Sequence, residues 1–210
     1  MAKIPLALLA LLSLPSIAQA HEIWVERDAT GPARIYLGEP AEVQPAGGDP
    51  EFEKLTAPKL FPASPAAQVR KIGYIEVAAA PGDVRVIDDS VFEPWGDDGK
   101  KQGVIYYARA GRSETKAALP LEIAPTVAKG DTFILLRDGK PVPATKILVI
   151  SPDKWSKSFT TDAQGQVALP IKDKGRYILS ATQEEKGDLA LGGAKVAMLY
   201  HMTTLSFVKD

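Results

Sequence analysis

Cysteine is absent from this chain of 210 residues, and histidine occurs only twice. Without thiols the chain can form no disulfide, and it cannot bind zinc or an iron–sulfur cluster through cysteine. An excess of charge of either sign is also absent, because 25 Lys and Arg residues stand against 26 Asp and Glu residues. A charge balance so near neutrality argues against nucleic acid or an anionic membrane surface as a partner.

The common catalytic motifs are missing as well. The chain has no Gly-x-Ser-x-Gly motif for a nucleophilic serine, and the pair Gly192-Gly193 precedes a predicted strand, not a phosphate-binding helix. Catalysis by two carboxylates stays open, because the spatial separation of carboxylates is not visible in a sequence. The first expectation is therefore a protein that is not an enzyme.

Long apolar runs are scarce, and the longest lies at the N-terminus. Lys3 precedes the uncharged apolar stretch 4–14, and Ala18-Gln19-Ala20 is a small-x-small cleavage site. This is the pattern of a secretory signal peptide, and the apolar stretch is shorter than the roughly twenty residues that span a bilayer. We therefore expect residues 1–20 to be removed, leaving a periplasmic or secreted protein that begins at His21 and is not inserted in a membrane.

The remaining sequence consists of short strand-like runs punctuated by 17 Gly and 17 Pro. Runs such as Ile23-Trp-Val and Arg34-Ile-Tyr-Leu are rich in β-branched and aromatic residues, and no segment shows a helical apolar period. This pattern predicts an all-β fold made of two immunoglobulin- or transthyretin-like β-sandwich halves.

Three segments are expected along the chain. After the signal peptide, residues 21–126 form an N-terminal β domain with an irregular excursion at about 40–68, which contains one helical turn near residues 52–55. Residues 127–210 form a transthyretin-like sandwich in which Asp138-Gly139 closes a hairpin, because glycine accepts the positive φ of a primed turn. Residues 187–193 are expected to form a flexible loop before a final strand over 195–208, paired inside a sheet because its apolar side chains need burial.

Two resemblances add to this interpretation. The second half resembles a transthyretin or carboxypeptidase-regulatory sandwich module, through Asp138-Gly-Lys-Pro-Val-Pro-Ala, Thr161-Asp-Ala-Gln-Gly and Gly175-Arg-Tyr. The chain from His21 onward resembles a bacterial family of periplasmic proteins of unknown function that are commonly labelled nickel- or cobalt-uptake components. The segments that carry this second resemblance are His21-Glu-Ile-Trp-Val-Glu, Tyr107-Ala-Arg-Ala-Gly-Arg-Ser-Glu-Thr-Lys, Leu119-Pro-Leu-Glu-Ile and His201-Met-Thr-Thr-Leu-Ser-Phe. The resemblance implies a periplasmic metal-handling role, with a separate membrane transporter as the partner in any transport.

The two histidines are the candidate metal ligands. Cleavage after Ala20 would give His21 a free α-amine beside its imidazole, and both nitrogens are available as neutral ligands near neutral pH. His201 is the only other imidazole, and it would complete three nitrogens around Cu(II) or Ni(II), with Co(II) also possible. The alternatives are a histidine on a frayed terminus for His21 and a hydrogen-bonded core histidine for His201. Met198, Met202 and Glu22 are weaker candidates, which are better explained by core packing or solvent exposure.

Three functions remain open at this stage. The first is a periplasmic binding protein that captures or delivers a divalent transition metal. The second is a metal-free β-sandwich module that binds protein or glycan. The third is a copper-dependent oxidase of polysaccharides, which would use the same His21 site.

Overall fold

The computed structural model describes residues 21–210, so the predicted signal peptide lies outside the described part of the chain. Within this part every regular element is a β-strand except η1, a short 3-10 helix over Phe52–Lys54. The all-β fold and the helical turn near residues 52–55 are therefore confirmed. No helix in residues 21–210 is long and apolar enough to cross a membrane.

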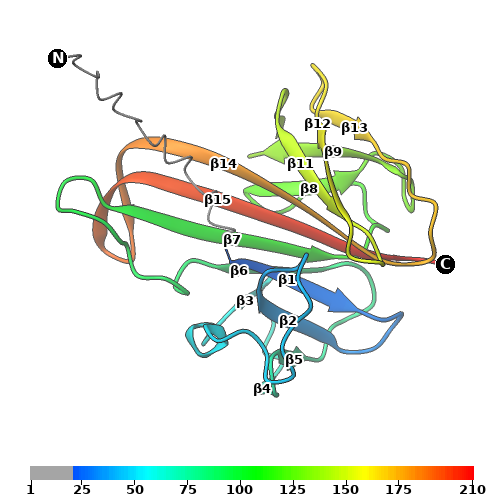
Figure 1. Cartoon of the computed structure of the whole chain (residues 1–210), viewed down its shortest axis with the longest axis horizontal. Helices are drawn as coiled ribbons and strands as arrows, with labels where there is room; N and C mark the ends of the chain where they lie inside the picture. Colours follow the sequence, from blue (N-terminus) through cyan, green and yellow to red (C-terminus); the bar gives the residue numbers. More distant parts are fainter. Residues whose placement is uncertain (1–20) are drawn as a thin grey trace, which may run out of the picture.

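A seven-stranded sheet forms the middle of the molecule (Figure 1), in the order β12-β11-β14-β15-β7-β6-β3. Neighbouring strands are antiparallel except β15 and β7, which are parallel. The bounds are β3 Lys59–Phe61, β6 Val84–Asp88, β7 Gln102–Ala110, β11 Lys146–Ile150, β12 Ser156–Thr160, β14 Gly175–Leu191 and β15 Ala194–Lys209. The final strand, β15, is paired on both sides, as the sequence predicts.

Two smaller sheets cover the two faces of this central sheet (Figure 1). The β1 sheet has the order β1-β2-β5-β4, with β1 Glu22–Arg27, β2 Ala33–Gly38, β4 Gln68–Arg70 and β5 Ile75–Val77. The β9 sheet has the order β10-β9-β13, with β8 also paired to β9, and comprises β8 Leu121–Pro125, β9 Thr132–Arg137, β10 Lys140–Pro141 and β13 Gln166–Ala168. The molecule is thus a layered β-sandwich with two interfaces.

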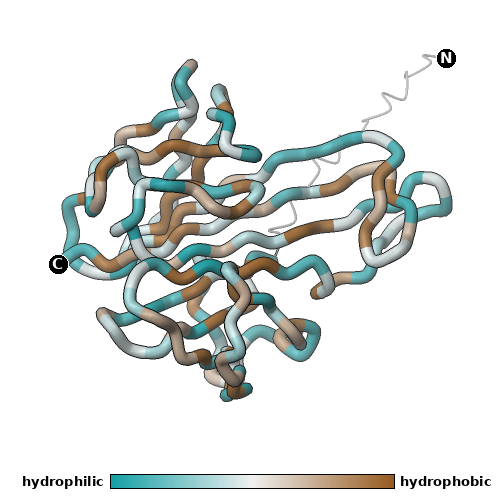
Figure 2. Tube along the Cα trace, turned by 180° about the vertical axis from the view of Figure 1, so that it is seen from behind, coloured by the Kyte–Doolittle hydropathy of each residue, from teal (hydrophilic) through white to brown (hydrophobic). Residues whose placement is uncertain are grey.

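Each interface has its own apolar core, because alternate side chains of a strand point to opposite faces. Even-numbered residues of β7, such as Tyr106 and Ala108, pack with Ile23 and Ile35 of the β1 sheet. Tyr107, the odd-numbered neighbour, packs on the opposite face with residues of the β9 sheet. Figure 2 shows the corresponding hydrophobic segments along the strands of the layers.

The predicted halves do not separate at residues 126 and 127. That point falls between β8 and β9, which pair with each other, and β7 of the first half pairs with β15 of the second. The two halves therefore share the central sheet. Turn signals report only local pairing, so they could not reveal a parallel contact between strands so far apart in the sequence.

Two hairpins test the turn predictions. Asp138 and Gly139 both have positive φ, at 50° and 75°, and they join β9 to β10 as predicted. The loop predicted over 187–193 is wrong, because β14 continues to Leu191 and only Gly192-Gly193 separates it from β15. A register shift between Lys186 and Leu189 accommodates Gly187 within the strand.

Candidate functional site

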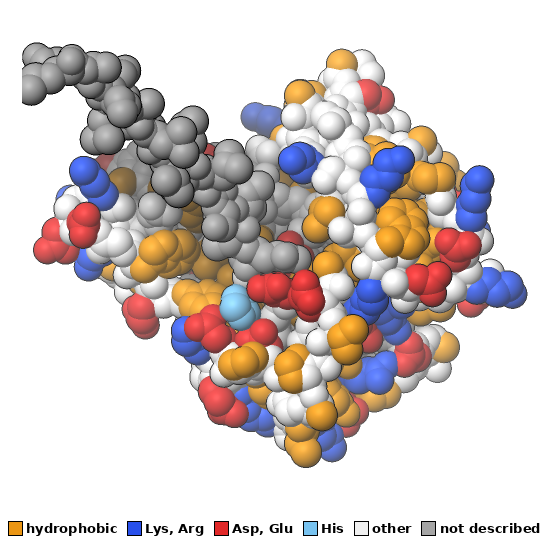
Figure 3. Space-filling model, in the orientation of Figure 1, with side chains coloured by type: hydrophobic (Ala, Val, Ile, Leu, Met, Phe, Trp, Pro, Cys, Tyr) orange, Lys and Arg blue, Asp and Glu red, His pale blue; other side chains and the backbone are white. Residues whose placement is uncertain are grey.

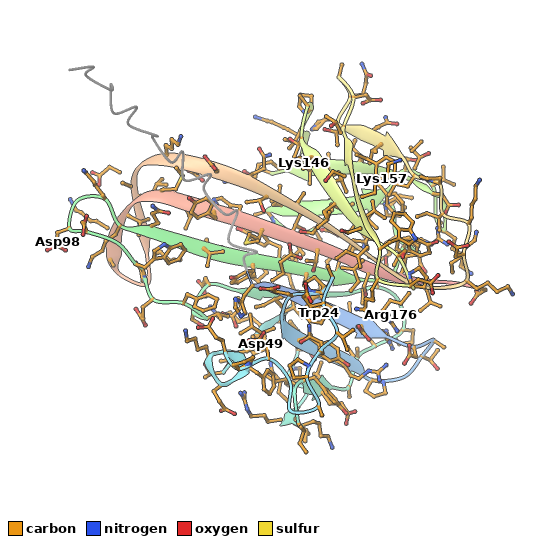
Figure 4. All side chains as sticks on the ribbon, in the orientation of Figure 1. Trp24, Asp49, Asp98, Lys146, Lys157 and Arg176 are labelled. Atoms are coloured by element: carbon orange, nitrogen blue, oxygen red, sulfur yellow. The ribbon has the colours of Figure 1, made fainter. Side chains whose placement is uncertain are left out.

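His21 lies directly before β1, at the side of the central sheet that the β1 sheet covers. Its imidazole Nε2 is 3.1 Å from Oδ1 of Asp49 and 3.6 Å from Oε2 of Glu51. The side chain of His21 is 27% exposed and that of Asp49 is 11% exposed, so a half-buried imidazole contacts a largely buried carboxylate. Figure 3 shows a histidine among acidic side chains on this face, and Figure 4 labels Asp49 near the start of β1.

The excursion at 40–68 fixes the position of Asp49. Its Oδ1 also accepts a hydrogen bond of 2.8 Å from the backbone N–H of Glu51. The following turn, η1, is anchored in the core by Phe52 and Leu55, which are buried. Gly38, the β2 residue that pairs with Glu22, has a φ of +145°, and a Cβ there would lie 3.0 Å from Oδ2 of Asp49. A glycine at the end of β2 therefore leaves room for the carboxylate beside His21.

A pocket of about 540 Å³ opens beside His21. Its floor consists of even-numbered residues of β7, β14 and β15, at the end of the central sheet that projects beyond the two covering sheets (Figure 1). Its walls come from the η1 segment and from the connection between β6 and β7, where Figure 4 labels Asp98. The lining residues are His21, Glu51, Phe92, Trp95, Gln102, Val104, Tyr106, Thr182, Tyr200 and Met202.

Aromatic rings dominate this pocket. The rings of Trp95 and Tyr200 are parallel within 7°, with centroids 6.3 Å apart. The ring of Phe92 lies near two further rings of the pocket. Its centroid is 6.0 Å from that of His21 and 6.4 Å from that of Tyr106. Burial raises the pKa of Tyr106, and the nearby carboxylates of Glu22 and Glu51 raise it further, so this hydroxyl stays protonated at neutral pH. Tyr106 thus lines the pocket with an uncharged hydroxyl.

His201 lies on the other face of the central sheet, and the structure does not bring it together with His21. Its Nδ1 is 3.0 Å from the hydroxyl of Tyr107, and its Nε2 is 2.9 Å from Oε2 of Glu185. Its neighbour Met202 points to the opposite face and lines the pocket with His21. The predicted shared site is therefore corrected: His201 is a buried, hydrogen-bonded histidine, and the residues of β15 that reach the pocket are Tyr200 and Met202.

The surroundings of His201 give stability a pH dependence. Burial lowers the pKa of His201, and the guanidinium of Arg137, whose Nη2 is 3.0 Å from Nε2, lowers it further. Glu185 and Asp138 oppose this shift, and burial raises the pKa of the facing Tyr107 to about 12, so that its hydroxyl is uncharged. The imidazole of His201 therefore binds a proton more readily in the unfolded chain than in the folded chain.

Stability from this group is complete above the ordinary imidazole pKa of about 6.5 and is lost as the pH falls below it. We expect the unfolding free energy of wild-type protein to decrease from pH 7.5 to pH 5.5 by more than that of His201→Gln. Urea unfolding of both proteins at the two pH values measures the difference, which is specific to this imidazole. Equal pH dependence of the two proteins would show that His201 does not titrate in this way.

The sequence did not point to most of this site. Asp49 and Glu51 lie in the excursion that is predicted to be irregular, and only the tertiary fold places them beside His21. Core packing, the interpretation that the sequence favours for Met202, agrees with its burial in the apolar core beside the β1 sheet, and the same side chain also lines the pocket. The aromatic residues carried no motif, so their convergence could not be predicted.

Within residues 21–210 no group of three or more His, Cys, Asp or Glu side chains is arranged to hold a metal ion. The nitrogen of His21 is an amide in the full chain of 210 residues and becomes an amine only on cleavage after Ala20. Any metal site at His21 would therefore be completed by processing. Comparisons with protein-family models, curated proteins and solved structures found no match for this chain.

Proposed function

We propose that the processed protein binds one divalent transition-metal ion at His21 and captures or delivers it for uptake or homeostasis. The observation that supports this most directly is the contact of 3.1 Å between Nε2 of His21 and Oδ1 of Asp49. Metal-binding imidazoles typically donate their second ring N–H to a carboxylate, which fixes the tautomer and makes the other nitrogen a better ligand. In the tautomer that donates Nε2–H to Asp49, Nδ1 of His21 is the nitrogen that keeps its lone pair.

Nδ1 and the α-amine of one N-terminal histidine can chelate the same ion. Two nitrogen ligands favour Cu(II) or Ni(II), with Co(II) below them in the order of affinities, and copper is preferred where it is present. Glu51 and Met202 line the same pocket and offer a carboxylate oxygen and a thioether sulfur as further ligands. This donor set needs only His21 from the original pair of histidines.

The secretory pattern supports a site of action in the periplasm or outside the cell, where the amine would be free. A membrane transporter would be the partner in any uptake. The alternative is a metal-free interaction module, for which an absence of metal binding by processed protein would be the evidence. A pocket beside His21 favours a small ligand over a polysaccharide, which needs an extended surface, so the copper oxidase receives less support.

Replacing Asp49 by asparagine should weaken Cu(II) binding by about tenfold, at the lower end of the effects seen for such outer-shell partners. Asparagine can still accept the backbone N–H of Glu51, so the turn should persist while the charged acceptor for the imidazole is lost. Isothermal titration of processed protein with Cu(II), against a competing chelator, measures the change.

Two control variants accompany this test. Asp138→Asn removes a carboxylate that is 70% exposed and does not line the pocket, and His201→Gln changes the other histidine. Both should bind Cu(II) as wild-type protein does. Unchanged affinity in Asp49→Asn, or a loss in His201→Gln equal to that in Asp49→Asn, would contradict the role assigned to Asp49.

A further inference from the structure

The pocket beside His21 is much larger than a single ion requires. Its volume is about 540 Å³, and six of its lining side chains are aromatic or aliphatic: Phe92, Trp95, Val104, Tyr106, Tyr200 and Met202. Apolar pockets of this size with a few polar groups typically bind small organic molecules. We propose that the protein binds its metal ion together with a small, planar, uncharged nitrogen chelator, of the imidazole or pyridine type, which occupies this pocket. The inference rests on the proposed binding of metal at His21.

Coordination chemistry gives the first reason. The amine and Nδ1 of His21 fill two positions, whereas Cu(II) and Ni(II) with nitrogen ligands commonly take four in a plane. The remaining polar groups that line the pocket are Glu51, Gln102 and Thr182, and Gln102 already accepts a hydrogen bond of 3.0 Å from the hydroxyl of Tyr200. The two remaining positions of the ion can be taken by Glu51 and Met202 or by a bidentate chelator, and of these only the chelator would also fill the apolar pocket.

The shape of the walls gives the second reason. The rings of Trp95 and Tyr200 are stacked nearly parallel in one wall of the pocket, and the edge-oriented rings of Phe92 and His21 meet at 67°. Aromatic rings gain stabilisation from offset or edge-to-face contacts beyond that of simple burial. A planar ring bound to the ion at His21 would contact these walls, whereas an aliphatic chelator would lose the stacking.

Charge selects among planar chelators. Asp49 and Glu51 contact His21, and Lys54 has its Nζ 2.5 Å from Oε1 of Glu51 and 4.7 Å from the ring centroid of Phe92. Two carboxylates against one ammonium leave the surroundings negative. An uncharged chelator keeps the full positive charge of the divalent ion, and an anionic one reduces it. Electrostatic complementarity with the negative surroundings therefore favours an uncharged nitrogen chelator over an anionic one.

The experiment uses processed protein loaded with one equivalent of Cu(II), and 2,2′-bipyridine as the probe. The reference is the peptide His-Glu-Ile-amide with Cu(II), which has the same chelating terminus without the pocket. Titration calorimetry should show that bipyridine binds the copper-loaded protein at least tenfold more tightly than the copper-loaded peptide. Trp95→Ala should remove most of this difference, because Trp95 is part of the aromatic wall of the pocket. Trp95 is 41% exposed, so its replacement should leave the fold intact.

Trp155→Ala is the matched control, because Trp155 is 42% exposed and lies outside the pocket. It should bind bipyridine as wild-type protein does. Equal bipyridine affinity in protein and peptide, or no effect of Trp95→Ala, would overturn the inference while metal binding at His21 stands. Failure of processed protein to bind Cu(II) before bipyridine is added would instead reject the proposed function and, with it, this inference.

Discussion

Replacing Glu122 by glutamine should lower the free energy of unfolding by about 3–5 kcal/mol, the usual effect of removing one partner from a buried ion pair. Glu122 lies in β8 and is fully buried, and its Oε1 accepts hydrogen bonds from Nε of Arg85 at 2.8 Å and Nη1 of Arg109 at 2.7 Å. Its Oε2 accepts the backbone N–H groups of Ala118 and Leu119 at 2.6 and 2.8 Å. Glutamine would remove the negative charge that compensates the buried guanidinium groups of Arg85 and Arg109. Its single carbonyl oxygen also cannot accept all four hydrogen bonds.

The matched control is Glu114→Gln. Glu114 also forms an ion pair with Arg85, at 2.7 Å, but its side chain is 48% exposed. Exposed ion pairs contribute about 0–1 kcal/mol, so this variant should differ little from wild-type protein. Urea unfolding followed by circular dichroism measures both variants. Equal, small losses for the two would mean that the buried ion cluster does not hold β8 and the β9 sheet against the central sheet.

This cluster explains one of the sequence segments that carried the family resemblance. In the stretch 107–116, Arg109 contacts Asp83 as well as Glu122, and Gly111 has a φ of +105° with the Asp83 carboxylate packed where a Cβ would be. The segment thus has a structural role between two layers. The sequence shows that these charged residues are present, but it does not show that their charges are buried and paired.

The all-β character followed from the sequence because strand signals are local. Short β-branched runs, turn residues and the apolar face of the final strand each reflect contacts within a hairpin or between alternate side chains. The parallel pairing of β7 with β15 depends on distant segments, so the shared central sheet was not predictable from such signals. The same limit applies to the predicted boundary near residue 126.

The same distinction between local sequence signals and contacts of distant segments applies to the candidate site. His21 could be singled out because a cleavage motif precedes it and its chemistry is contained in one residue. The period of two along β15 placed His201 and Met202 on opposite faces, but the sequence did not show which face His21 would meet. Asp49 could not be singled out from the sequence, because only the folding of the segment between β2 and β3 places it beside His21.

A free amine at His21 is the central requirement of the proposed metal site. Acetylation of the N-terminal amine of His21 would convert it into an amide and introduce no new amine, which would leave the imidazole as the only nitrogen ligand of the terminus. The loss of one coordinate bond and of the chelate should weaken Cu(II) binding at least tenfold, or about 1.4 kcal/mol. The side chains of Asp49, Glu51 and the pocket are unchanged in the acetylated protein, so its fold should be the same.

The most direct test is a calorimetric titration of Cu(II) into processed protein that begins at His21, compared with the same protein acetylated at its N-terminus. The proposal predicts one ion bound per chain of processed protein and an affinity at least tenfold lower for the acetylated protein. Circular dichroism of both proteins checks that the β-sheet content is the same. Equal affinities for the two proteins, or no binding to the processed one, would contradict a metal site built on the N-terminal histidine.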